Sequence, residues 1–171
     1  MGKGQTFLSD FTVSMAVFSV IVVAFFIPWN TVIEANSRFD QAEDMKTQVR
    51  RTSVFLTTTP GYPSDWEKDT VNATIPGFAT GENILSRKKI AEFANMSYDN
   101  QTELLQAQHY YLTIINEKPV KINGRNATYG KNPANTSYNP DTVVTVTRDI
   151  AVNGTEVKPA KLKYSIWRER R

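Results

Sequence analysis

The chain has 171 residues, a formal net charge of +3 and no cysteine. Without cysteine it can form neither disulfide bonds nor cysteine-ligated zinc or iron–sulfur sites. Lysine and arginine are interleaved with aspartate and glutamate, and no basic stripe accompanies them, so we expect no nucleic-acid partner. Beyond an apolar stretch near the start, the polar remainder is long enough for one domain of ordinary size.

An uncharged apolar stretch of 19 residues runs from Phe11 to Trp29. About 20 helical residues cross a hydrocarbon core about 30 Å thick, so this stretch is predicted to span a membrane. One alternative is a buried core helix, but such a helix usually has a polar face. Another is an ordinary secretory signal, but the bulky residues Ile27 to Trp29 do not form the small-residue cleavage site that it requires.

Two features precede the apolar stretch. The leader, residues 1–4, carries Lys3 and ends in Gly4, with Gln5 next. Asp10 lies directly before the stretch, and a carboxylate there would cost about 2.5–3.5 kcal/mol if carried to the bilayer centre. Asp10 is therefore expected either to cap a helix at the membrane interface or to pair with an amine of a neighbouring subunit.

This arrangement resembles the N-terminus of archaeal type IV pilins and pilin-like proteins, whose class III signal peptide is a short basic leader ending in glycine. The resemblance implies that a prepilin peptidase cuts between Gly4 and Gln5 on the cytoplasmic side and leaves the apolar helix in the mature protein. Asp10 would then be the sixth mature residue, whereas the acidic residue of the family commonly lies at about the fifth position.

The resemblance also implies that the apolar helix is an assembly element. With the help of the pilus assembly machinery, polymerisation would move it from lipid into the core of a homo-oligomeric helical filament. We expect Asp10 to guide docking by charge pairing. The residues expected to carry assembly are Asp10, Phe11, Val17, Val20 and Phe25.

The helix is predicted to continue beyond the membrane as an amphipathic segment and to stop before Pro60-Gly61. Its apolar residues approximate one helical face: Val32, Ile33, Phe39, Ala42, Met45, Val49 and Leu56. The expected organisation is a leader peptide at 1–4, an N-terminal helix at 5–59 (apolar at 11–29, amphipathic at 30–56) and an extracellular head domain at 60–171.

The head domain combines helical and strand patterns. Two short helices are expected between Gly81 and Gln106, and strands from His109 onward. Alternation on both sides of Asn153-Gly154 predicts an antiparallel hairpin. The predicted fold class is therefore α+β: a long N-terminal hydrophobic helix like a pilin spine, followed by a small head domain with short helices and an antiparallel β-sheet.

The resemblance extends into the head domain. The segment Thr59 to Glu67, which reads TPGYPSDWE, is followed by Pro76 to Ala79, which reads PGFA, and a closing strand ends near Trp167. These motifs look like the head-domain pattern of certain euryarchaeal proteins with class III signals. They imply a pilin-like protein over most of the chain. Trp66 is expected to anchor local packing.

Asn-x-Ser/Thr triplets are more frequent than the composition predicts. About two are expected by chance, and all those present lie after the apolar helix, on the side where N-linked glycans would be attached. The acceptor residues are Asn72, Asn95, Asn100, Asn126, Asn135 and Asn153. Those in or beside turns, Asn126, Asn135 and Asn153, are expected to be the most accessible.

Nothing in the sequence indicates an enzyme. The chain has one histidine, His109, beside two tyrosines at the start of a predicted strand, where packing is the ordinary role. No phosphate-binding loop, nucleophile elbow or zinc-protease motif is present. We therefore expect no catalytic residue, no cofactor and no metal ion, with N-linked glycans as the expected modification.

The expected function is that of a structural subunit of an archaeal type IV pilus-like surface filament. The protein would be inserted in the cell membrane before assembly and would lie at the cell surface afterwards. Alternatives are a membrane-anchored surface glycoprotein that never polymerises, and a minor pilin or adhesin that does not form the bulk filament. A head domain that binds a surface or a sugar is a further possibility.

Overall fold

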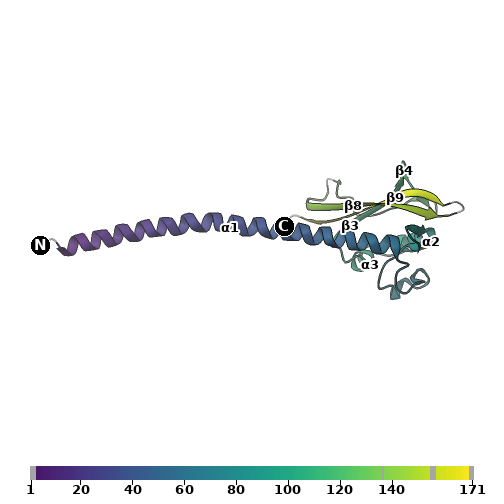
Figure 1. The fold of residues 1–171 in the computed structure, drawn as a ribbon, viewed down its shortest axis with the longest axis horizontal. Coiled ribbons are helices and arrows are strands. Elements are labelled where there is room, and N and C mark those ends of the chain that lie inside the picture. Colours follow the sequence, from purple (N-terminus) through teal and green to yellow (C-terminus); the bar gives the residue numbers. More distant parts are fainter. Residues whose placement is uncertain (1–2, 136, 155–156, 170–171) are drawn as a thin grey trace. The chain divides into compact units, whose positions relative to one another are not determined.

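The computed structural model describes residues 3–135, 137–154 and 157–169, without the side chains of residues 3–9, 30–31, 34–35 and 37–38 (Figure 1). The chain divides into two compact units, Met1–Gln41 and Ala42–Arg171. The helices are α1 (Lys3–Thr58), α2 (Arg87–Asn95) and α3 (Tyr98–Leu104), with short 3-10 helices η1 (Trp66–Lys68) and η2 (Thr70–Asn72). The strands are β1 (Ala79–Gly81), β2 (Ile84–Ser86), β3 (His109–Asn116), β4 (Lys118–Pro119), β5 (Lys121–Ile122), β6 (Arg125–Asn126), β7 (Thr128–Gly130), β8 (Pro140–Asn153) and β9 (Lys158–Glu169).

The first unit is helical throughout its described residues, and α1 continues through Pro28. Many of its residues are valine, isoleucine, phenylalanine or threonine, which have modest helix propensity in water. In a hydrocarbon environment such residues still form a helix, because the backbone must satisfy its own hydrogen bonds. The local sequence therefore fits a helix in an apolar environment.

The second unit contains a seven-stranded sheet in the order β1-β2-β8-β9-β3-β4, with β7 also pairing with β3. The long β8–β9 hairpin confirms the prediction of antiparallel strands around Asn153-Gly154. The predicted antiparallel sheet is nevertheless wrong in one respect. Because β2 runs parallel to the end of β8, pairing Leu85 with Val152, the sheet is mixed. The fold class is α+β with an N-terminal apolar helix.

The core of this unit lies against one face of the sheet. Inward-facing residues of neighbouring strands are paired in register, as Leu112 of β3 with Tyr164 of β9. Helices α1 and α2 contribute to the same cluster through their apolar side chains. The fully buried members of this cluster include Val49, Leu56, Ile90, Phe93, Tyr110, Leu112, Ile114, Leu162 and Tyr164.

The apolar residues expected on one face of the amphipathic part of α1 differ in their burial. Met45, Val49 and Leu56 are buried in the second unit. Val32, Ile33 and Phe39, in the first unit, are exposed. The sequence grouped these two sets because each apolar residue lies close to the helical face of the preceding one. Over several turns, however, the apolar positions move gradually around the helix axis.

The two head-domain motifs that carry the resemblance contact each other. Trp66 Nε1 donates hydrogen bonds to the carbonyl oxygens of Pro60 (3.1 Å) and Gly77 (3.0 Å), which confirms the predicted anchoring role of Trp66. A Cβ on Gly77 would lie 2.3 Å from the Gly61 nitrogen, so only glycine fits there. The buried Lys89 Nζ also donates to the Pro60 carbonyl, at 2.5 Å. These contacts fix the segment that follows α1.

His109 lies in an aromatic cluster at the start of β3. Its ring stacks on Trp167 with 4.4 Å between centroids. Its Nδ1 lies 3.1 Å from the Tyr98 hydroxyl, and its Nε2 lies 3.7 Å from Glu169 Oε1. Burial, with a further contribution from the charge of Lys131, lowers the pKa of His109 below its ordinary value of about 6.5, although Glu169 opposes this shift.

This lowered pKa predicts that the second unit loses stability in mild acid. The unfolded chain takes up a proton at His109 more readily than the folded chain, so the stabilisation is present above about pH 6.5 and falls as the pH drops below it. We expect the melting temperature of the full chain in detergent to fall between about pH 7.5 and about pH 5.5. The variant His109→Gln should show a much smaller fall, and an equal fall in both proteins would contradict this role.

Candidate assembly helix and glycosylation sites

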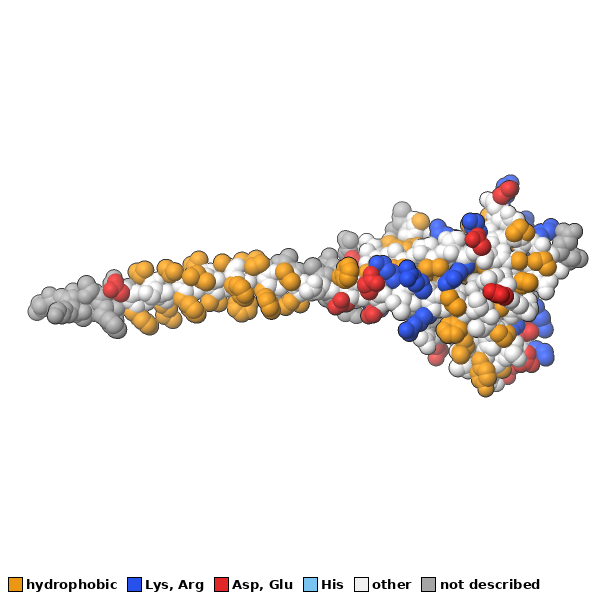
Figure 2. All heavy atoms as spheres, in the orientation of Figure 1, with side chains coloured by type: hydrophobic (Ala, Val, Ile, Leu, Met, Phe, Trp, Pro, Cys, Tyr) orange, Lys and Arg blue, Asp and Glu red, His pale blue; other side chains and the backbone are white. Residues whose placement is uncertain are grey.

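One segment of the described chain is long and apolar enough to cross a membrane: Asp10–Trp29 within α1, with a mean hydropathy of 2.4. None of its most apolar window is buried within the structure. In Figure 2, hydrophobic side chains cover most of the visible face of this segment. Ser19 is an exception whose hydroxyl donates to the Met15 carbonyl at 2.8 Å, so its polar group is satisfied within the helix. The surface of the segment is therefore mainly apolar, without a strongly polar face.

The predicted processing and pairing residues lie at the start of α1. Gly4 and Gln5 have helical backbones, and the Gln5 side chain lies outside the described part of the structure. Asp10 is exposed at the border of the apolar segment. The cut between Gly4 and Gln5 and the charge pairing of Asp10 therefore stay predictions.

The predicted apolar assembly residues are all accessible. Phe11, Val17, Val20 and Phe25 have exposed fractions between 54% and 69%. Helical spacing places Phe11 and Phe25 on one face but Val17 and Val20 on another. A single neighbouring helix could not contact all four, so they would need partners on at least two sides.

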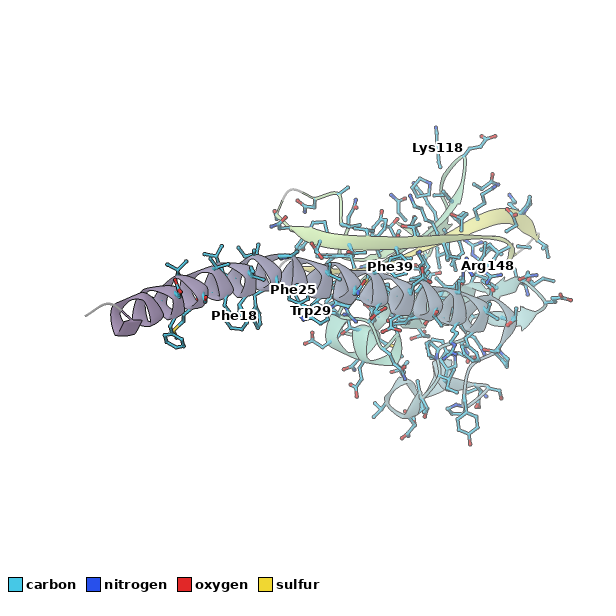
Figure 3. All side chains as sticks on the ribbon, turned by 60° about the vertical axis from the view of Figure 1, so that its left-hand side comes forward. Phe18, Phe25, Trp29, Phe39, Lys118 and Arg148 are labelled. Carbon is cyan, nitrogen blue, oxygen red and sulfur yellow. The ribbon has the colours of Figure 1, made fainter. Side chains whose placement is uncertain are left out.

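Sequence reasoning missed a regular apolar stripe along the first unit. Starting at Phe11 and ending at Phe39, steps of four and three residues in turn reach an apolar residue every time except once. This is the heptad spacing that lets two helices pack along a common seam. The members of the apolar stripe are Phe11, Met15, Phe18, Val22, Phe25, Trp29, Val32 and Phe39. The spacing could have revealed the stripe, but the other apolar residues of the membrane segment conceal it. Figure 3 labels four of its members, Phe18, Phe25, Trp29 and Phe39.

The exception in the apolar stripe is Asn36, which occupies the position between Val32 and Phe39. Its side chain is exposed. A single asparagine at such a position is compatible with packing between helices. It lowers the stability of the packed helices somewhat but fixes their register and their number. Asn36 is therefore a polar residue within the apolar stripe, and the heptad spacing continues on both sides of it.

The apolar stripe continues beyond the length that a membrane requires. Phe25 and Trp29 stack with 5.9 Å between their ring centroids at the end of the apolar segment. Phe39 follows Trp29 by ten residues, or about 15 Å along a helix, and its side chain is 66% exposed. An exposed phenylalanine at that position lies outside the hydrocarbon core when Asp10–Trp29 spans it. It is therefore available to another protein surface.

Every predicted glycosylation asparagine is exposed, and not only the three in or beside turns. The exposed asparagines are Asn72, Asn95, Asn100, Asn126, Asn135 and Asn153. Asn95 is the last residue of α2, and Asn126 lies in β6. Asn135 accepts a hydrogen bond from the Ser137 amide at 3.1 Å, which forms a local turn. The asparagine of every triplet is therefore accessible to solvent.

Among the described residues, no group of three or more histidine, cysteine, aspartate or glutamate side chains could hold a metal ion. Comparison of the chain with protein-family models, with curated proteins and with solved structures gives no match. The functional conclusion therefore depends on the residues of α1 and on the surface of the second unit.

Proposed function

We propose that this protein is the structural subunit of an archaeal type IV pilus-like surface filament, assembled through the part of α1 that lies in the first unit. A prepilin peptidase would cut after Gly4, and the membrane would hold the subunit before assembly. The second unit would be the outward-facing head domain, modified by N-linked glycans. The observation that carries the proposal is the apolar stripe, which extends beyond the membrane segment to Phe39.

The free energy of exposing its apolar side chains to water indicates that the segment lies in an apolar environment. Burying one large aliphatic or aromatic side chain contributes about 1.5–3 kcal/mol. The segment from Phe11 to Trp29 exposes many such side chains, so its solvation in water would cost on the order of 20 kcal/mol. Lipid removes this cost for the membrane segment, and packing against identical helices would do so in a filament.

The part of the apolar stripe beyond the membrane favours assembly over simple anchoring. Val32 and Phe39 are both more than half exposed. Lipid tails would not reach them, and a lone anchor would gain nothing from a regular apolar seam in water. Another helix with the same spacing fits this seam, and identical subunits supply that helix. Because a repeat of 3.5 residues drifts relative to a straight helix, the packed helices would supercoil with a left hand.

Asp10 gives the first test of the proposal. The variant Asp10→Ala should insert into the membrane normally but yield fewer filaments, by about tenfold, because docking would lose a charge pair worth about 1.4 kcal/mol. Asp40→Ala, the same change on an exposed aspartate of α1 outside the apolar segment, is the control. Sheared filaments and membrane-bound chain would be quantified by immunoblot.

Equal filament yields from Asp10→Ala and the wild type would contradict the pairing role. If wild-type cells hold only detergent-soluble monomers, the protein is a membrane-anchored glycoprotein. If this chain is only a trace component of filaments built from another subunit, it is a minor pilin or an adhesin. Both results would contradict the proposed function.

A further inference from the structure

A hollow of about 410 Å³ lies on the second unit, between the end of α2 and the β5–β6 hairpin. Its lining includes Ala91, Ala94 and Asn95 from α2, and Ile122, Asn126 and Tyr129 from the hairpin and β7. The volume is within the range of about 300–1,000 Å³ that is typical of small-ligand sites. The hollow is therefore large enough for a small polar ligand.

Two of the predicted glycosylation asparagines lie on the rim of this one hollow. Asn95 comes from α2 and Asn126 from β6, and they are 31 positions apart in the sequence. The other acceptors, Asn72, Asn100, Asn135 and Asn153, are not among its lining residues. The folding of the chain thus brings a sugar-acceptor triplet next to a cavity on the same surface.

The environments of these two asparagines differ. Asn95 Nδ2, the atom that would carry a glycan, donates to Glu92 Oε2 at 3.4 Å. Its triplet ends in Ser97, whose hydroxyl caps α3 by accepting from the Asn100 amide. Within the described part of the chain, the Asn126 side chain makes no hydrogen bond and stands exposed on the short β6 strand. Asn126 is therefore the better attachment point, and Asn95 lies on the opposite wall.

The lining of the hollow suits a sugar. Sugar rings have apolar faces of C–H groups and a rim of hydroxyl groups, so they need both apolar and polar contacts. Ile122 is buried and Tyr129 is half-buried, and burial raises the pKa of Tyr129 to about 12, so its hydroxyl is a neutral hydrogen-bonding group. The Asn95 amide and the Arg125 guanidinium supply polar groups.

We propose that a glycan attached to Asn126 folds back into this hollow, stacks on Tyr129 and makes hydrogen bonds to Asn95. Covalent attachment matters because a tether of one residue gives the sugar an effective concentration in the millimolar range, enough for a shallow site of low affinity. The inference rests on the proposed function in one respect: the second unit must lie on the glycosylating side of the membrane.

The attachment requires an activated sugar donor linked through phosphate. Asn126 Nδ2 forms a bond to the anomeric carbon of the donor sugar and loses one proton to solvent. The bond between that carbon and the phosphate oxygen breaks, and the phosphate leaves with the electron pair. No oxidant or reductant is needed.

The test compares the wild type with four variants of the full chain, purified in detergent from the membranes of glycosylating cells. Asn126→Gln removes the acceptor, and Thr128→Val removes the triplet while leaving Asn126 in place. Thr128→Ser keeps the triplet and is the matched control for Thr128→Val. Asn153→Gln removes an acceptor outside the hollow. Glycopeptide mass spectrometry and backbone hydrogen exchange are measured on each form.

The wild type and Thr128→Ser should carry a glycan on Asn126. Exchange in residues 91–95 and 122–129 should be at least about threefold faster in Asn126→Gln and Thr128→Val, and unchanged in Asn153→Gln. An unmodified Asn126 in the wild type would overturn the inference, and so would a glycan whose removal leaves exchange unchanged. Filament yield is measured separately. If the glycan on Asn126 slows exchange in both segments but the cells make no filaments, the proposed function is contradicted and this inference stands.

Discussion

Replacing Phe39 with aspartate is expected to abolish filament formation while leaving the protein in the membrane. Phe39 is exposed within the first unit and ends the apolar stripe, so its substitution removes no packing from the core of the second unit. In an assembled filament the new carboxylate would lie in an apolar seam between helices, and its desolvation would cost several kcal/mol at each contact. Because every subunit repeats the change, filament yield should fall by at least about a hundredfold.

The control for Phe39→Asp is Gln41→Asp. Gln41 is exposed on α1 and, two residues further along, lies on the opposite face of the helix. Both variants would be compared in sheared surface fractions and in membrane fractions. Normal filaments from Phe39→Asp, or equal losses in both variants, would show that the stripe does not mediate assembly.

Among the substitutions described, Phe93→Ala should produce the largest loss of folding stability. Phe93 is 0% exposed and lies at the centre of an aromatic cluster, 5.3 Å from Phe78 and 6.2 Å from both Tyr110 and Tyr129 between ring centroids. Truncation of such a residue costs about 3–5 kcal/mol, because the lost contacts leave a cavity that the core closes only in part. A domain of this size is stable by about 5–15 kcal/mol, so the variant retains little margin.

This loss can be measured by thermal unfolding of the full chain in detergent, followed by tryptophan fluorescence. Phe93→Ala should lower the melting temperature by about 10 °C or more. Phe55→Ala is the matched control, because Phe55 is 46% exposed and its truncation should cost less than about 1 kcal/mol. Similar melting temperatures for the two variants would contradict the assigned core.

The features that the sequence predicted correctly depend on local patterns. The charge-free run from Phe11 to Trp29 predicted the apolar helix, because length and composition alone decide whether a helix can span hydrocarbon. Alternation of apolar and polar residues around Asn153-Gly154 predicted the β8–β9 hairpin, because its two strands are adjacent in the chain.

The features that the sequence did not predict depend on distant contacts. Strand β2 has only three residues, too few for a periodic pattern, and its partner in β8 lies more than 60 residues away. The hollow beside Asn126 likewise forms only when α2 meets the β5–β6 hairpin. The exposure of Phe39 required the structure as well, since the same spacing rule placed it on one face with Val49 and Leu56, which are buried.

The most direct test of the proposed function is electron microscopy of sheared surface material combined with mass spectrometry of its protein. The proposal predicts filaments composed chiefly of this chain, with Gln5 as the first residue. Recovery of the chain only as detergent-soluble monomers, with no filament containing it, would contradict the proposal.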